Sequence, residues 1–278
     1  MGADTKKLRN RIKSVDSTLH LTKAMGLVAS SKIRRAMLAM KRGREYEEAT
    51  RTAIEPLLSC PECQKSPYMR KADGNRLCLV VIAGDRGLAG GYNANIFRLG
   101  EALSLGKEAL WLPIGKKAAE YYSHRKREIL TDAFSRSADV GVGDALSLGN
   151  LVCEEYMKGS FDRVVLIYTK FVSMMTQAPA YEQLLPLEID AERGNPPEFD
   201  GDADEMLAKV VPQYVGGVIF SAMKESLASE DGARRNAMNA ANKNAKEMID
   251  SLVLKYNRAR QAVITQEITE IVSGAEAL

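Results

Sequence analysis

The final stretch of the chain, from Ser229 onward, has the apolar spacing of a long helix. Apolar and small residues recur there at steps of three or four: Met238, Ala241, Ala245, Ile249, Leu252, Tyr256, Ala259 and Val263. This spacing places them on one helical stripe, as in the seam of a coiled coil. A helix of roughly 60 residues would be about 90 Å long at 1.5 Å per residue. Because no single globular core is that wide, we expect this helix to pair with another long helix or to run through a partner.

The first 40 residues carry a matching stripe. Its members are Leu8, Ile12, Val15, Leu19, Thr22, Gly26, Ala29, Ile33, Ala36 and Met40. Pro is absent until Pro56, and strong helix formers fill the other faces. The two stripes predict an antiparallel coiled coil in which facing residue numbers sum to about 260, so that Leu8 lies near Leu252. A helical hairpin of a general all-α protein is the alternative that the pattern alone leaves open.

The middle of the chain alternates predicted strands with predicted helices. Residues 77–83 form a continuous apolar run, which is typical of a strand buried on both faces. Further strands are predicted near 110–114, 128–132 and 163–168, with an antiparallel return over 173–187. The alternation indicates an α/β domain with a mostly parallel sheet and Rossmann-like layers. The predicted domains are a coiled-coil helix (1–56), a linker (57–76), the α/β domain (77–203) and a second coiled-coil helix with a shaft tip (204–278).

The charge is unevenly distributed, although the net charge is only +3. Residues 1–55 hold 13 Lys or Arg against 6 Asp or Glu, whereas the segment 188–205 is acidic. A basic helix can be a solvated face, a nucleic-acid arm or a surface for an acidic partner, and charge alone favours the solvated face. No secretory signal is expected, because the first residues are charged and no apolar run follows them. The run 77–83 is too short to cross a bilayer, so membrane association is expected only through partners.

One loop has the composition of a phosphate cradle. The sequence GDRGLAGG, from Gly84 to Gly91, follows a predicted strand and precedes a predicted helix. It matches neither GxGxxG nor a Walker motif, so a tight strand-to-helix turn is favoured over nucleotide binding. A nucleotide-sensing α/β domain with helical arms stays as the alternative, and a coiled coil that binds nucleic acid is a third.

The sequence offers little other chemistry. Cys60 and Cys63 have CxxC spacing, but no second pair or His cluster completes a zinc site, which favours structural thiols. The two histidines, His20 and His124, stand near no nucleophile pattern. We therefore expect no catalytic site, cofactor or metal in this chain.

Four segments, in order along the chain, resemble the gamma subunit of the F-type ATP synthase. They are LTKAMGLVASSKIRRA from Leu21, GDRGLAGGYN from Gly84, MTQAPAYEQLLPL from Met175 and NRARQAVITQEITEIVSGA from Asn257. The resemblance covers nearly the whole chain and implies a rotor shaft. Such a shaft couples ion-driven rotation of the membrane ring to ATP synthesis or hydrolysis at sites on the alpha and beta subunits. It also implies an epsilon subunit and a c-ring as partners, no nucleic acid, and a place on the cytoplasmic face of a bacterial membrane.

The resemblance also assigns contact residues. On the side of the catalytic head they are Lys23, Met25, Arg234, Arg260, Gln261, Thr265 and Glu267. At the foot of the shaft, on the epsilon and c-ring side, they are Asp85, Arg86, Gly87, Gly90 and Gly91. The chain departs from the family pattern at Gly26, where a long side chain is common, at Arg235, and in its CxxC pair. Gly26 implies either local flexibility or close packing of the two helices.

Overall fold

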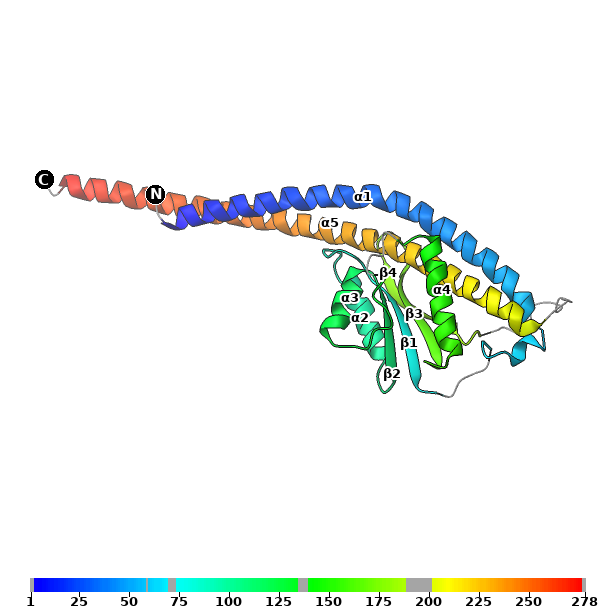
Figure 1. Ribbon diagram of the computed structural model, residues 1–278. Helices are drawn as coiled ribbons and strands as arrows, with labels where there is room; N and C mark the ends of the chain where they lie inside the picture. The colour runs from blue at the N-terminus through cyan, green and yellow to red at the C-terminus, as the bar shows by residue number, and fades with distance from the viewer. Residues whose placement is uncertain (1–2, 59, 70–73, 135–139, 189–201, 277–278) are drawn as a thin grey trace. The chain divides into compact units, whose positions relative to one another are not determined.

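The computed structural model describes residues 3–58, 60–69, 74–134, 140–188 and 202–276. The chain forms two compact units. The coiled-coil unit comprises Met1–Ala29 and Arg235–Leu278, and the α/β unit comprises Ser30–Arg234. Two long helices, α1 (Ala3–Leu58) and α5 (Ala203–Glu276), contribute to both units (Figure 1).

The α/β unit is built on a four-stranded sheet in the order β2-β1-β3-β4. Its strands are β1 (Arg76–Ile82), β2 (Glu108–Ile114), β3 (Arg163–Phe171) and β4 (Gln177–Leu185). β1 pairs parallel with both β2 and β3, and β4 returns antiparallel beside β3. The shorter helices are α2 (Tyr92–Leu103), α3 (Lys116–His124) and α4 (Val142–Met157), with a 3₁₀ turn, η1 (Cys63–Lys65), after α1. The prediction of a mostly parallel α/β sheet is confirmed.

The predicted strand at 128–132 is wrong. Its only pairing is a single bridge between Ile129 and Trp111 of β2. Ile129 and Leu130 pack against the core there, but exposed polar and charged residues at 123–128 come immediately before them. Two apolar residues are too few to extend the sheet beyond β2.

Both faces of the sheet are covered. One face of β1, carrying Cys78, Val80 and Ile82, belongs to a core cluster that also contains residues of α4 and α5. The other face, carrying Leu79 and Val81, packs against α2 and α3. The unbroken apolar run of β1 thus reflects burial on both sides, as predicted.

The crossing of α4 and α5 is unusually close. A Cβ atom on Gly149 would lie 2.3 Å from the Pro212 carbonyl oxygen, and one on Gly216 would lie 2.8 Å from the Ala145 carbonyl oxygen. The two helices therefore meet backbone to backbone at these glycines. Pro212 lies inside α5, and α1 continues to Leu58, past the expected stop at Pro56.

A part of α5 is apolar enough to cross a membrane by length and composition alone. The helical segment Ala203–Ser273 contains an 18-residue window of mean hydropathy 1.3, and 61% of that window is buried inside the protein. Burial against the sheet and α4 accounts for the apolar composition, because α5 supplies core residues from Leu207 to Met223.

Within the coiled-coil unit, α1 and α5 run antiparallel. Val15 and Leu19 form a buried cluster with Ala245, flanked by Ile249 and Leu252. The residues of both predicted stripes are buried or half-buried, from Leu8 to Met40 and from Met238 to Val263. Gly26 lies opposite Met238, so the facing residue numbers sum to 264, about one helical turn from the expected 260.

Candidate partner-contact surfaces

The end of α5 presents polar side chains to solvent. Arg260, Gln261, Thr265 and Glu267 are all exposed. Their local hydrogen bonds stay on the helix, where the Thr265 hydroxyl donates to the Gln261 carbonyl at 2.9 Å. The guanidinium of Arg260 is therefore available to form paired hydrogen bonds with a carboxylate on another molecule.

Large apolar side chains share this end of α5. Ile264, Ile268 and Ile271 are 46%, 56% and 71% exposed. They recur at steps of four and three, so they form a stripe on one helical face. An exposed apolar stripe beside polar groups is typical of a surface that a partner covers.

On α1, Lys23 is exposed and Met25 is half-buried. They stand beside Leu27 and Val28, which are 73% and 57% exposed. A Cβ atom on Gly26 would lie 3.5 Å from the Met238 Cβ, an ordinary van der Waals distance. Gly26 is thus at the helix seam, and steric crowding does not require glycine there.

The loop after β1 is held by side-chain hydrogen bonds to the helices beside it. The Gly84 amide donates to Asn93 Oδ1 at 2.9 Å, and the Lys116 amide at the start of α3 donates to Asp85 Oδ1 at 3.0 Å. A carboxylate therefore already occupies the N-terminal end of α3. These bonds hold the loop against α2 and α3 as a structural turn.

The same loop packs against α5. A Cβ atom on Gly84 would lie 2.7 Å from the carboxylate of Glu230, which is one turn before α5 leaves the α/β unit after Arg234. Leu58 and Ala203 mark the other end of the paired helices in this unit. The assignment of Asp85, Arg86, Gly87, Gly90 and Gly91 to the foot of the shaft stays a prediction. Within the α/β unit, the loop contacts α5 near Glu230. The contact between Gly84 and Glu230 joins distant parts of the chain and could not be predicted from the sequence around either residue.

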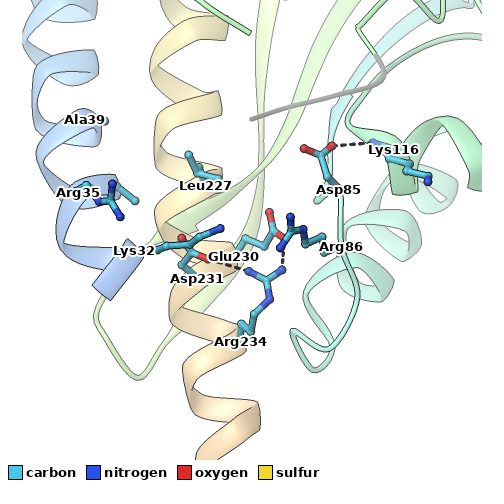
Figure 2. A pocket seen from close by; sticks show the side chains of 11 residues that line it. Lys32, Arg35, Ala39, Asp85, Arg86, Lys116, Leu227, Glu230, Asp231 and Arg234 are labelled. Carbon is cyan, nitrogen blue, oxygen red and sulfur yellow. Dashed lines mark hydrogen bonds and ion pairs between the residues drawn. The ribbon is translucent and has the colours of Figure 1, made fainter. Parts of the chain in front are cut away.

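Beside the loop is an open cavity of about 690 Å³ (Figure 2). Figure 2 shows Lys32 and Arg35 on the α1 side, Arg86 and Lys116 on the loop side, and the acidic groups of α5 between them. These four basic side chains are exposed. The lining residues are Lys32, Arg35, Ala36, Ala39, Asp85, Arg86, Lys116, Leu227, Glu230, Asp231 and Arg234.

Arg234 is held by ion pairs within α5. Its guanidinium bonds to Glu230 and, at 2.8 Å, to Asp231, and its side chain is only 12% exposed. Burial raises the pKa of both carboxyl groups, and the charge of Arg234 opposes that rise. The structure therefore places Arg234 in a buried charge cluster, apart from the exposed contact candidates on the last turns of α5.

The four cysteines are free, and all are buried in one core cluster. Burial raises the pKa of the Cys63 thiol to about 11 and that of the Cys153 thiol to about 12. A buried thiol with a raised pKa is a poor nucleophile. Within the described residues, no three His, Cys, Asp or Glu side chains gather to hold a metal ion.

The sequence analysis did not identify a cluster of three polar side chains that are buried in the core. Glu225, Ser226 and Ser229 of α5 are 5%, 1% and 0% exposed. The available signal was a cluster of polar residues at helical spacing, directly after the apolar run that ends at Met223.

Comparisons with known proteins give one consistent result. A family model described as ATP synthase matches residues 4–278. The ATP synthase gamma chain of Ruminococcus albus is 43% identical over 282 residues, covering 98% of each chain. The sodium ion specific ATP synthase gamma chain of Acetobacterium woodii is 36% identical and covers all of both chains.

Solved structures share the fold at lower identity. The rotor of the Euglena gracilis mitochondrial ATP synthase has a TM-score of 0.68 at 17% identity, covering 95% of this chain and 100% of that one. The central stalk and c-ring structure from Tetrahymena thermophila contains a chain with a TM-score of 0.61 at 21% identity, covering 80% of this chain and 99% of that one.

Proposed function

We infer the function from a premise that the comparisons establish: this chain belongs to the ATP synthase gamma-chain family. It is accordingly a non-catalytic subunit of the peripheral sector of that enzyme. As the central shaft, it couples rotation of the membrane ring to ATP synthesis and hydrolysis at sites on the surrounding subunits. The observation that carries this function is full-length identity of 43% to a gamma chain, over a fold with two long helices.

The mechanism follows from asymmetry. The helices α1 and α5 differ in sequence, so their coiled coil is not symmetric about its long axis. As it turns, it therefore presents a different face to each of the surrounding catalytic sites. Each contact stabilises one conformation of that site over the others. Coupling requires that the contact free energies differ among those conformations.

The head contacts are proposed at Lys23 and Met25 on α1 and at Arg260, Gln261, Thr265 and Glu267 on α5. The exposure of the five polar side chains, together with the apolar stripe of Ile264, Ile268 and Ile271, supports this assignment. Arg260 would supply a directional bond to a carboxylate of the head, and the isoleucines would supply apolar contact. The contact assigned to Arg234, which is held in ion pairs within α5, stays a prediction.

The loop residues Asp85, Arg86, Gly87, Gly90 and Gly91 are proposed to face a second partner surface, at the part of the α/β unit where the loop contacts Glu230 of α5. The exposed basic groups Lys32, Arg35, Arg86 and Lys116 beside them suit an acidic segment. Contacts with the epsilon subunit and the c-ring are then assigned to the end of the α/β unit that carries Leu58 and Ala203. The complex is proposed to lie on the cytoplasmic face of a bacterial membrane.

Affinity purification of a tagged full-length chain from membranes tests this function. The alpha, beta, epsilon and ring subunits should co-purify in a complex that hydrolyses ATP. Recovery of the chain without these subunits would contradict the proposal. Tight ATP binding by the purified chain itself would instead support the nucleotide-sensing alternative.

A further inference from the structure

Strand β3 extends beyond its neighbour β1. The β1–β3 pairing ends at Val81 and Ile167, whereas β3 continues to Phe171. On its other edge β3 stays paired with β4 as far as Phe171 and Gln177. The edge of β3 that faced β1 therefore loses its partner strand, because the chain turns away at Gly84. Buried backbone groups on that edge need other partners.

Helix α5 supplies those partners through three side chains. The Thr169 amide donates to Ser226 Oγ at 3.2 Å, and the Ser229 hydroxyl donates to the Thr169 carbonyl at 3.0 Å. The Phe171 amide donates to Glu225 Oε1 at 2.8 Å. These three side chains are almost fully buried, so they take the place of the missing strand.

The same turns of α5 are tied to two other elements. The Tyr92 hydroxyl of α2 donates to the Ser226 carbonyl at 3.0 Å. Arg44 of α1 pairs with Glu225 at 2.8 Å. Five polar contacts thus join about one and a half turns of α5 to β3, α2 and α1.

These contacts differ in kind from the rest of the interface. From Leu207 to Met223, α5 meets the sheet and α4 mainly through apolar side chains. Apolar contact resists separation but has no preferred direction, whereas a hydrogen bond fails once its geometry is lost. The polar contacts therefore add a directional restraint against turning or sliding of the sheet on α5 to the restraint that close packing provides.

We propose that Glu225, Ser226 and Ser229 are positioning residues that lock the α/β unit to α5 and carry torque between them. They lie on the last turns of α5 before it enters the coiled-coil unit after Arg234. This inference rests on the proposed function, because torque must pass between a unit that meets the ring and a shaft that meets the head.

The test uses the assembled complex in membrane vesicles. In one preparation, ATP hydrolysis and ATP synthesis driven by an imposed ion gradient are measured for the Ser226→Ala/Ser229→Ala variant. We expect hydrolysis to be retained and the ratio of synthesis to hydrolysis to fall about fivefold or more, since two buried backbone groups lose their partners. An unchanged ratio overturns the proposal.

Two single variants at one position sharpen the test. Glu225→Gln keeps a carbonyl oxygen that can accept from the Phe171 amide, whereas Glu225→Met keeps the length of the side chain but offers no such acceptor. Coupling should survive in the first and fall in the second. Equal loss in both would mean that charge pairing with Arg44 matters and the backbone contact does not, which overturns the proposal for this residue. If the Ser226→Ala/Ser229→Ala variant does not assemble, the two Glu225 variants still test the proposal.

The control for general destabilisation is Ile96→Ala. Ile96 is buried in the core cluster on the α2 and α3 face of the sheet, and that cluster contains no residue of α5. It should lower stability without lowering the coupling ratio. If Ile96→Ala lowers that ratio as much as the serine changes do, the polar contacts are merely structural. If the unsubstituted complex synthesises no ATP, the proposed function itself fails instead.

Discussion

The hydroxyl of Thr22 on α1 donates a hydrogen bond of 2.6 Å to the side-chain carbonyl of Asn242 on α5. Both residues lie in the seam of the coiled-coil unit, among small and apolar neighbours. A polar pair in such a seam favours one register, because a slide by one turn breaks the hydrogen bond between the two helices. Their numbers sum to 264, as do those of Gly26 and Met238.

The register predicts which engineered cysteines will crosslink. Leu19→Cys with Ala245→Cys should form a disulfide rapidly under mild oxidation, since these side chains share one buried cluster. Leu19→Cys with Ala237→Cys, about two turns out of register, should not. Electrophoresis without reductant separates the two outcomes, and efficient crosslinking of the second pair alone would show that the register is wrong. The native cysteines are buried and should not interfere.

The sequence predicted the seam well because helical periodicity is a local property. Ala29, Ile33, Ala36 and Met40 are all buried as expected. The register was missed by one turn, because runs of small residues on both helices allow equivalent offsets. The pair that decides between them, Thr22 and Asn242, is polar and does not stand out in a search for apolar spacing.

Long-range contacts of the α/β unit could not be predicted in the same way. The turn at Gly84 was evident from its glycines, but its neighbour Glu230 comes from a distant part of the chain. Ser226 and Ser229 have the composition of a solvated helix face. They are buried beside the part of β3 that extends past β1, and the polar cluster after Met223 does not by itself report that difference in strand length.

The close crossing of α4 and α5 predicts opposite effects for two glycines of α4. Gly149→Ala should lower the free energy of unfolding by about 1–3 kcal/mol or more, because the new methyl group would overlap the Pro212 backbone. Gly143→Ala should be neutral or stabilise by about 0.4–1 kcal/mol, since no atom lies within 4 Å of its Cβ position. Thermal unfolding of the two variants compares them directly. Equal stability would mean that the helices are not in backbone contact.

Two carboxyl groups should affect stability with opposite dependence on pH. Burial raises the pKa of the Glu230 carboxyl in the folded protein. Ionisation of this group therefore lowers the free energy of unfolding as the pH rises above the pKa of Glu230 in the unfolded chain. The stability of Glu230→Gln relative to the unsubstituted protein should therefore improve between pH 4 and pH 7. Denaturant unfolding at several pH values measures this change, and an advantage that shrinks as the pH rises would contradict it.

Asp162 provides the matched comparison. Hydrogen bonds from the side chain and the backbone amide of Arg76, two of them at 2.9 Å, lower the pKa of the Asp162 carboxyl. The ionised Asp162 carboxylate stabilises the fold when the pH is above the pKa of Asp162 in the unfolded chain. This stabilisation is lost as the pH falls through the pKa of Asp162 in the folded protein. Asp162→Asn should therefore cost most stability at neutral pH, and the cost should shrink as the pH falls below about 4.

The proposed head contact is tested by replacing Arg260 and Gln261 together with Ala. Both side chains are exposed, so folding and helix content should not change. Losing a charged hydrogen bond at an interface costs about 2–5 kcal/mol when the partner charge stays buried. The assembled complex should therefore show reduced ATP synthesis and reduced ATP-driven rotation.

The control is a double change of the same chemistry on an exposed part of α5 outside the proposed contact, Lys243→Ala with Asn244→Ala. It should leave both activities near their original values. Full activity of the Arg260 and Gln261 variant would mean that these side chains are only solvated. A complex that does not assemble would give them a role in holding the subunits together, because an exposed pair on a helix contributes little to the fold of its own chain.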